Sequence, residues 1–594
     1  MTTPTIGSGC GAAFSGDVLG RVAWSSGVAL LCWLGALHLG VVLTFAVGGA
    51  VSAALAPAVT AAALVSAWWF ARRSGLPNAS ALASALVTAI TIAMGLALAA
   101  TFIDLSWDGQ WYHQTAVYKM AEGWNPLRDP IHAFGRHSWN QWVLHYAKGP
   151  WYVALALFAA TGNIEIAKAA SAITPAIALL VVLAAALDLG LERRWAILVA
   201  LVAAIDPVTT CGLVTHQVDG ILVSLMACAV AAGASFLRRP AWLPALAGFV
   251  AATLCMNAKF TGLVYLCFFF LAGGAYCVWW RRDVVVRYGM LTGAALVVGI
   301  LVLGFNPYVT NTVHRGHPFY PVQGSAAFPS LADRGRDPIE IYETPRNMVG
   351  RSRGLRLAYA VFGKPGTAPY VTKDAEFTWP FAATWDDFAL YYFHDVRIAG
   401  FGPLFSGALV LALGLAAVAC VRRALPGGVA LIGGAIVASL LVSTHTWWAR
   451  YGPHLWWLPV ILVAATLRSE GPGWLKRAAA AIAVILLVDA LLIGGVHARW
   501  EWRSTQALHQ QLTDLREAGP MTVALASFDV PVAERFRTAG VAFDAAGKYE
   551  CPSARQLTLM SVSRGYPGWI RICLADQARA AQLQSLPQWQ WSAH

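Results

Sequence analysis

The feature that most constrains this chain is a series of apolar runs, each close to the length that crosses a lipid bilayer. A transmembrane helix needs about 20 predominantly apolar residues. Such runs recur between residues 24 and 496, and the chain is 58% hydrophobic and only 12% charged. Soluble proteins average about 25% charged residues. The sequence therefore predicts an all-α, polytopic membrane protein, and it lacks the short alternating segments of a barrel.

Basic residues at the ends of these runs predict the topology, because short cytoplasmic loops are rich in Lys and Arg. The clusters are Arg72–Arg73, Arg193–Arg194, Arg238–Arg239, Arg281–Arg282, Arg422–Arg423, and Arg468 with Lys476 and Arg477. All of them lie on one side if the chain crosses about 13 times. The expected spans are 24–45, 47–70, 80–103, 165–189, 195–213, one ending at Arg238, a hairpin at 242–280, 288–305, 400–421, 427–443, one ending at Arg468, and 478–496. This topology places the N-terminus in the cytoplasm and the C-terminus outside.

Two units are expected, a transmembrane module at 1–498 and an exported domain at 499–594. The first outer loop, 105–150, is rich in Trp from Trp107 to Trp151 and predicts short helices in the membrane interface. The long segment at 307–398 is also placed outside, since long loops cross regardless of charge. Its arginines include Arg334, Arg336, Arg346, Arg351, Arg353 and Arg356. The tail alternates helix and strand patterns, which predicts a small α/β domain and permits a Cys551–Cys573 disulfide.

Polar residues gather at the outer ends of the expected spans. They are Asp104, Asp108, His113, His216, Asp219, Lys259, His314, Arg315, His317, Arg450 and His454. A transporter would spread polar groups through the bilayer midplane, and a channel would carry a polar stripe along several helices. A site at the boundary instead suits a lipid-borne substrate, whose tail stays in the bilayer while its head group reaches the interface. The net charge of +12 comes from Arg at helix ends and indicates no nucleic-acid partner.

Three segments resemble the GT-C superfamily of membrane glycosyltransferases. They are "DGQWYHQTAVYKMAEGWNP" at 108–126, "NPYVTNTVHRGHPFYP" at 306–321 and "WWARYGPHLWWLP" at 447–459. The plan of many spans, interfacial loop helices and an exported tail is also similar. The resemblance implies a sugar donor carried on polyprenyl phosphate or diphosphate, in a bacterial plasma membrane with the site on its periplasmic face.

Asp108 is the expected general base. Sugar transfer to a hydroxyl needs a carboxylate that takes the acceptor proton, and one carboxylate is enough for an inverting displacement from a phosphate leaving group. The alternative is that Asp108 only caps the helix that follows it. Asp104, four residues earlier, either shares the site or ends the preceding helix.

Cationic side chains are the expected ligands of the donor phosphate. Lys259 lies at the tip of an apolar hairpin, where it either meets an anion or extends to water. Arg450 either binds phosphate bidentately or anchors the aromatic belt. Arg315 and His317 form either a phosphate clamp or a structural corner.

The remaining candidates line the sugar and acceptor pocket. They are Asp104, Trp111, Tyr112, His113, His216, Asp219, Tyr451 and His454. His113 has the alternative role of an interfacial hydrogen bond. His216 and Asp219 have the alternative role of joining Asp108 around a divalent ion, which some members of the superfamily use; we expect no metal or other cofactor.

The sequence thus predicts an inverting glycosyltransferase. It would move one sugar from a polyprenyl-phosphate carrier to a periplasmic glycan, lipid or protein hydroxyl. Two alternatives stay open: a polymerase or ligase of O-antigen type that uses lipid-diphosphate glycans, and a transporter of lipid-linked sugars without enzymatic activity.

Overall fold

The protein is described by a computed structural model of the chain, and it is mostly helical with one small sheet. The described residues are 17–333, 335, 337, 339–366, 374–422, 426–525, 528–546, 551–560 and 570–590. Arg334 and Arg336 of the long outer segment, and Arg423 of the Arg422–Arg423 cluster, lie outside these residues.

Eight helices of the described residues are long and apolar enough to cross a membrane. They are α1 (Val18–Ala46), α2 (Leu55–Arg73), α3 (Asn78–Thr101), α7–α8 (Ile164–Asp188), α11 (Asp219–Arg238), α13 (Phe260–Trp280), the segment Arg282–Leu303 that contains α14 (Val285–Val297), and α21 (Gly473–Ala518). Shorter apolar helices are α6 (Gly149–Thr161), α12 (Trp242–Ala258), α18 (Phe405–Val421) and α19 (Gly427–Val442). The chain is therefore a helical membrane protein by composition and length, and the predicted number of 13 spans is not confirmed.

The expected span at 195–213 is one place where the structure departs from the prediction. It consists of two short helices, α9 (Arg193–Ala204) and α10 (Pro207–Gly212). The Asp206 carboxylate accepts a hydrogen bond from the Thr209 backbone N–H, and Pro207 occupies the first turn of α10. An N-cap followed by proline starts a new helix, so the apolar run is interrupted.

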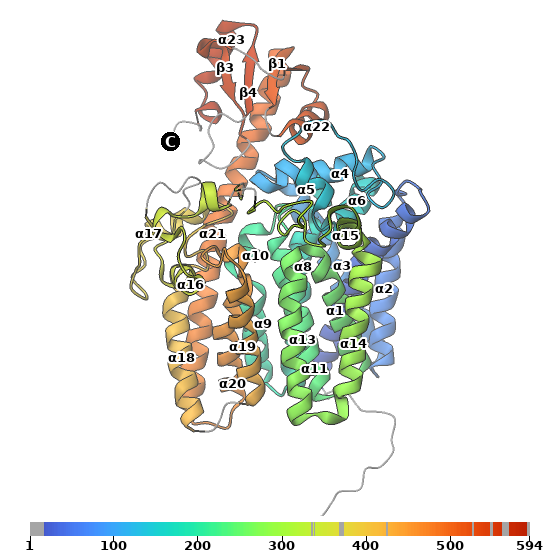
Figure 1. Cartoon of the computed structure of the whole chain (residues 1–594), viewed down its shortest axis with the longest axis vertical. Helices are drawn as coiled ribbons and strands as arrows, with labels where there is room; N and C mark the ends of the chain where they lie inside the picture. The colour runs from blue at the N-terminus through green and yellow to red at the C-terminus, as the bar shows by residue number, and fades with distance from the viewer. Residues whose placement is uncertain are drawn as a thin grey trace, which may run out of the picture.

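Short helices cover one end of the bundle. They include the π-helix Gly109–His113, α4 (Gln114–Ala121), α5 (Asn140–His145), α15 (Thr310–Arg315), α16 (Arg353–Phe362) and α17 (Trp385–Ala389). Figure 1 shows these helices lying between the long helices and the C-terminal sheet. The loop tryptophans were expected in the membrane interface, but Trp124, Trp139 and Trp151 are at most 5% exposed. These rings pack against neighbouring loops and helices, which makes this end a packed layer.

The C-terminal unit stands on a continuation of the last membrane helix. The helix α21 runs for 46 residues without a break, about 69 Å at 1.5 Å per residue, so the boundary expected at 499 lies inside it. Figure 1 shows α21 rising from the bundle into the sheet. The apolar side chains of Leu508, Leu512 and Leu515 on this helix join the core of the C-terminal unit.

The small sheet has the strand order β2-β1-β4-β3. Its strands are β1 (Met521–Leu525), β2 (Phe543–Ala546), β3 (Gln556–Thr558) and β4 (Ile570–Leu574). The parallel pair β1 and β2 is joined through α22 (Asp529–Ala539), and β4 pairs antiparallel with β1 and β3. The helix α23 (Gln577–Gln584) follows β4. This confirms the predicted α/β character, and a disulfide joins Cys551 to Cys573 as expected.

Candidate functional site

The segment after α3 carries two acidic residues with different surroundings. The Asp104 carboxylate accepts hydrogen bonds from the backbone N–H of Ser106, at 2.8 Å, and from its hydroxyl, at 2.6 Å. Asp108 directly precedes the π-helix, but its side chain makes no capping hydrogen bond there. Gly109 lies so close to Asp104 that an added Cβ would come within 2.1 Å of the carboxylate. The tight turn therefore needs glycine, and the Asp108 carboxylate accepts a hydrogen bond from Arg450 instead of capping the helix.

Arg450 is the centre of the site. Its guanidinium donates hydrogen bonds to Asp108 at 2.6 Å, to Asp219 at 3.0 Å and to Asp395 at 2.9 Å. These carboxylates come from the first loop, from the start of α11 and from the long loop before α18. The side chain of Arg450 is 11% exposed and that of Asp108 is 16% exposed. A single short 3-10 helix (Ala449–Tyr451) thus ties three distant parts of the chain together.

Lys259 joins the same cluster through Asp219. Its ammonium group lies 2.6 Å from the Asp219 carboxylate and 4.4 Å from the centre of the Tyr451 ring. Lys259 has extended backbone angles between α12 and α13, and it is 6% exposed. The ammonium group is therefore directed to a carboxylate and an aromatic ring inside the protein.

The cluster carries more negative than positive charge. Three carboxylates face two cations, Arg450 and Lys259, which leaves one negative charge in excess. Burial alone would raise the pKa of Asp108, but the Arg450 guanidinium holds that pKa below its usual range. Burial also opposes the charge on Arg450, yet Asp219, Asp395 and Asp108 hold its pKa above the ordinary value. Asp108 is therefore an ionised, weakly basic carboxylate while Arg450 is bound to it.

Aromatic side chains surround these charges. Tyr112 lies 5.9 Å from Tyr146 between ring centres, and Tyr146 stacks on Trp151 at 6.1 Å. The Trp151 indole N–H donates to Nδ1 of His113 at 2.6 Å, and Nε2 of His113 is buried without a hydrogen-bond partner among the described residues. Burial lowers the pKa of His113 to about 3, so the ring is neutral. Rings of this kind can pack on the apolar faces of a sugar, and His113 keeps one nitrogen free for hydrogen bonding.

The cavity that borders Asp219, Asp395 and Arg450 is small. Its volume is about 20 Å³, and His394 and Gln217 also line it. This volume holds a water molecule and no sugar. A sugar-sized substrate that reaches Arg450 through this cavity must therefore replace one of its present carboxylate partners.

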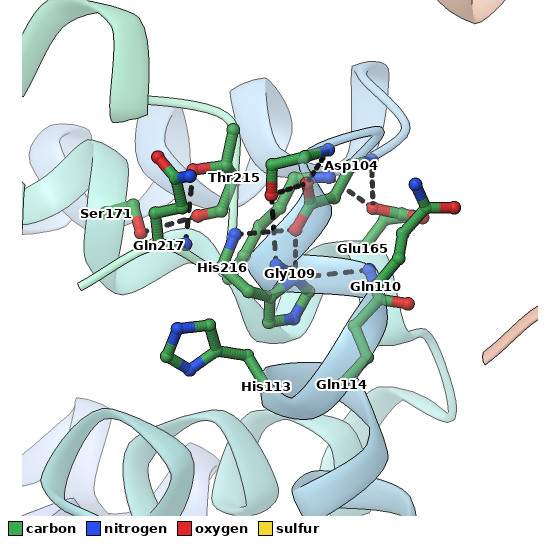
Figure 2. Close-up of polar contacts among 12 residues, drawn as sticks. Asp104, Gly109, Gln110, His113, Gln114, Glu165, Ser171, Thr215, His216 and Gln217 are labelled. Carbon is green, nitrogen blue, oxygen red and sulfur yellow. Dashed lines mark hydrogen bonds and ion pairs between the residues drawn. The ribbon is translucent and has the colours of Figure 1, made fainter. Parts of the chain in front are cut away.

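Asp104 and His216 form a second network beside the first. The Asp104 carboxylate accepts from the His216 backbone N–H at 2.7 Å and lies 2.9 Å from Nδ1 of its ring. The Asp104 backbone N–H donates to Glu165, which is paired with Lys168. Figure 2 shows Asp104, Glu165 and His216 joined by these contacts, with His113 to one side. Asp104 and His216 are thus bound to each other, apart from the three carboxylates on Arg450.

This second network also holds the C-terminal unit. Arg535 on α22 donates to the Gln110 side chain at 2.9 Å and to the Asp104 carbonyl oxygen at 3.3 Å. Its guanidinium also pairs with Glu165 at 3.5 Å. The unit is therefore fixed to the loop that carries Asp108.

The other predicted site residues contact neighbouring loops and helices. Arg315 packs over the rings of Tyr320 and Phe328, and Nδ1 of His317 accepts from the Phe319 backbone N–H. These contacts favour the structural corner over the phosphate clamp. Nε2 of His454 lies 2.8 Å from the Ser439 hydroxyl, between α19 and α20 (Trp457–Arg468). The Trp111 indole N–H donates to the Ser138 hydroxyl. Thus Asp108, Asp219, Lys259, Arg450, Tyr451, Tyr112 and His113 come together, and Arg315, His317, His454 and Trp111 do not contact the Arg450 carboxylates in the described structure.

Sequence reasoning missed Asp395, Tyr146 and Lys148. Asp395 binds Arg450 and also accepts from the Trp448 indole N–H at 2.6 Å. Its signal was its position at the end of the long loop, close to the outer end of the next apolar run. Lys148 is fully buried and donates to the carbonyl oxygens of Leu144 and Tyr146. A lysine between apolar and aromatic residues gave the only sequence signal for this buried charge.

The fold and the site define a polytopic helical membrane protein with a buried cluster of ion pairs at one end of its bundle. Within the described residues, no group of three or more His, Cys, Asp or Glu side chains is arranged to hold a metal ion. Comparison with known proteins adds no family: no protein-family model matches the chain, and no curated protein matches it.

Proposed function

We propose that this protein is an inverting glycosyltransferase that moves a sugar from a polyprenyl-phosphate donor to a hydroxyl acceptor. The observation that carries the proposal is the hydrogen bond between Arg450 and Asp108, with Lys259 one carboxylate away. A base and two cations are what this reaction needs: one group takes the acceptor proton, and the others stabilise the departing phosphate. The apolar helices beneath the cluster suit a donor whose lipid tail stays in the membrane.

In the proposed mechanism, the donor phosphate exchanges with Asp108 at Arg450. Arginine binds carboxylates and phosphates with the same fork of N–H groups, so the two anions compete for it. When Arg450 turns to the phosphate, Asp108 loses the partner that holds its pKa low. The freed carboxylate becomes a stronger base, and it then takes the proton of the acceptor hydroxyl as that oxygen attacks the anomeric carbon.

Asp219 and Asp395 keep the cations in place during this exchange. Asp219 pairs with both Lys259 and Nη2 of Arg450. Asp395 pairs with the other terminal nitrogen of Arg450, Nη1. Lys259 neutralises charge on the leaving phosphate. The rings of Tyr112, Tyr146 and Tyr451 line the sugar, and His113 offers Nε2 to one of its hydroxyls.

We propose that the site faces the periplasm of a bacterial plasma membrane. The helices α2, α11 and α13 end at Arg73, Arg238 and, one residue beyond α13, Arg281. Figure 1 shows the turn between α13 and α14 at the end of the bundle opposite the C-terminal sheet. Basic residues of this kind mark the cytoplasmic side. The full topology has about 13 crossings, in which the shorter helices α9–α10, α12, α18, α19 and α20 also span.

The test is a transfer assay in proteoliposomes with a panel of polyprenyl-phosphate hexoses and pentoses. Mass spectrometry follows loss of the sugar from the carrier and its appearance on added glycan, lipid or peptide acceptors. The parent protein transfers one sugar, whereas Asp108→Asn is inactive and the exposed control Asp386→Asn remains active. A folded Asp108→Asn variant that transfers at the parent rate would refute the base assignment.

The same assay separates the two alternatives. A polymerase would release products with many added residues from lipid-diphosphate glycans. A transporter would move the lipid-linked sugar across the membrane without breaking its bond to phosphate. Either result replaces the proposed function.

A further inference from the structure

A large apolar cavity lies at the other end of the bundle, away from the Arg450 cluster. Its volume is about 410 Å³, and helices α8, α9, α11 to α14, α19 and α20 line it. Lining side chains include Leu189, Ala227, Phe249, Phe269, Ile432 and Trp457. Figure 1 shows α11, α13, α14, α19 and α20 reaching the end of the bundle opposite the C-terminal sheet.

An apolar space of this size is unfavourable if it is left unfilled. Protein interiors are packed as densely as organic crystals, and atoms that line a void lose dispersion contacts on one side. The volume falls in the range of about 300–1,000 Å³ that is typical of pockets for small molecules. An occupant must be apolar along most of its length, because most of the lining is hydrocarbon and ring.

Two arginines give this cavity a cationic mouth. Arg238, the last residue of α11, and Arg468, the last residue of α20, both line the cavity. Nη1 of Arg238 is buried and has no hydrogen-bond partner among the described residues. Within the described residues, neither Arg238 nor Arg468 forms an ion pair with a carboxylate, whereas Arg281 at the same end is paired with Asp283. The Asp188 carboxylate acts electrostatically on Arg238, but its hydrogen bonds are with the Trp24 indole N–H and the Ser235 hydroxyl. In the described structure the cavity therefore ends in two cations that hold no ion pair.

We propose that this cavity binds an anionic phospholipid of the surrounding membrane, with an acyl chain inside and the phosphate on Arg238 and Arg468. Arginine binds phosphate oxygens through parallel N–H groups. Basic pockets between transmembrane helices bind anionic lipid head groups in this way. The phosphate supplies the partner that Nη1 of Arg238 lacks, and the acyl chain supplies the missing apolar contacts.

This lipid site is separate from the proposed donor site. Asp219 begins α11 and Arg238 ends it, and the 20 residues of this helix span about 30 Å. A phosphate on Arg238 therefore lies a membrane's thickness from Arg450. The lipid site does not depend on the proposed glycosyl transfer, and its test measures binding without any activity assay.

The first experiment compares lipids in nanodiscs. Delipidated protein is placed in phosphatidylcholine alone or with phosphatidylglycerol, and native mass spectrometry after release counts the retained lipids. We expect one retained phosphatidylglycerol and a higher unfolding temperature for the parent protein. The double variant Arg238→Gln with Arg468→Gln loses both effects, and the exposed neighbour control Arg239→Gln keeps them. Equal retention of phosphatidylcholine, or retention by the double variant, would overturn the proposal.

The second experiment fills the cavity and leaves both arginines intact. Gly233 lines the cavity, and a Cβ added there meets no atom within 4 Å, so Gly233→Leu occupies space that is free. Leucine is also a better helix former than glycine, which protects folding. Gly274→Leu on α13 is the matched control, because it too has open space but does not line the cavity. We expect only Gly233→Leu to lose the lipid.

Inorganic phosphate separates a lipid site from a simple anion site. If phosphate alone, in detergent without lipid, raises the unfolding temperature as much as phosphatidylglycerol does, and Gly233→Leu keeps that effect, the arginines bind free anions and the proposed lipid site is wrong. If phosphate has little effect, the acyl chain supplies the affinity, as the apolar lining predicts.

Discussion

Asp104 and Asp108 lie four residues apart in one loop and differ in what holds them. Asp104 is fully buried, and it binds Ser106 next to it and His216 across the loop. Asp108 keeps 16% of its side chain exposed and binds Arg450, which lies 342 residues away in the chain. The first carboxylate is enclosed by groups that donate hydrogen bonds to it. The second shares its partner with two further carboxylates.

The two networks also differ in charge balance. Around Asp104, the carboxylates of Asp104 and Glu165 face the cations of Lys168 and Arg535. Around Arg450, three carboxylates share two cations. A network with balanced charges favours one arrangement. An arginine with more anionic partners than it needs can exchange one for a substrate anion, and this difference is why we assign catalysis to Asp108 alone.

The largest expected effect is on the rate of sugar transfer by Asp108→Asn. An amide cannot take the acceptor proton, so the rate falls by about 10²–10⁴, the usual contribution of a general base. The steady-state transfer rate per folded protein gives this number, and thermal unfolding in detergent checks the fold. If Asp104→Asn lowers the rate per folded molecule as much as Asp108→Asn does, the contrast between the two carboxylates fails.

Removing Arg450 has the largest expected effect on stability. Arg450→Ala leaves three carboxylates in one place with only Lys259 nearby, which costs about 3–5 kcal/mol. Arg450→Lys keeps the charge but cannot reach all three partners, so its loss is smaller. Urea or thermal unfolding in detergent measures both. Arg346→Ala, which removes an exposed pair with Asp374, is the control and changes stability little, because exposed ion pairs are screened by water. A loss for Arg450→Ala no larger than this control would contradict the central role of Arg450.

A smaller loss of stability is expected for Asp104→Asn. All four contacts of the Asp104 carboxylate are with donors, so an amide nitrogen in its place meets N–H and O–H groups and leaves some of them unsatisfied. The cost is about 1–3 kcal/mol. Limited proteolysis of the C-terminal unit should rise in parallel, because Arg535 is docked on the same loop. Unchanged proteolysis would show that the unit is held elsewhere.

The smallest expected effect near neutral pH is a pH dependence of stability from His113. Burial lowers the pKa of His113 to about 3 from an unfolded value of 6.5, so above pH 6.5 the ring is neutral in both states. As the pH falls from 6.5 toward 3, the unfolded chain binds a proton that the folded site refuses. Stability then decreases by about 1.4 kcal/mol for each pH unit. In His113→Asn this part of the slope disappears, whereas the exposed control His509→Asn keeps it. Identical slopes for all three proteins would contradict a neutral His113.

Much of the fold could be predicted because apolar length and basic flanks are local signals. The long helices and the small α/β tail follow from composition and periodicity along short stretches. The break at Asp206–Pro207 also carries a local signal, a cap followed by proline, which a count of apolar residues overlooks. The continuity of α21 through residue 499 could not be read from the change in composition, since a helix can leave the membrane without ending.

The site was predictable only in part, because its contacts join distant segments. Asp108, Lys259 and Arg450 stand out as charges at the ends of apolar runs. Asp395 lies in a long polar loop with other acids, its place before the next apolar run is a weak signal, and only the fold brings it to Arg450. His454 shows the opposite error: it lies in the aromatic motif of Arg450, yet its ring is bound to Ser439 between two helices.

The most direct test of the account measures donor binding, not transfer. If the phosphate and Asp108 compete for Arg450, Asp108→Asn removes the competitor. Native mass spectrometry or titration in nanodiscs measures the binding of a polyprenyl-phosphate sugar. The Asp108→Asn variant should bind it as tightly as the parent protein or more tightly, although transfer is lost. Weaker donor binding by a folded Asp108→Asn variant would contradict the exchange at Arg450.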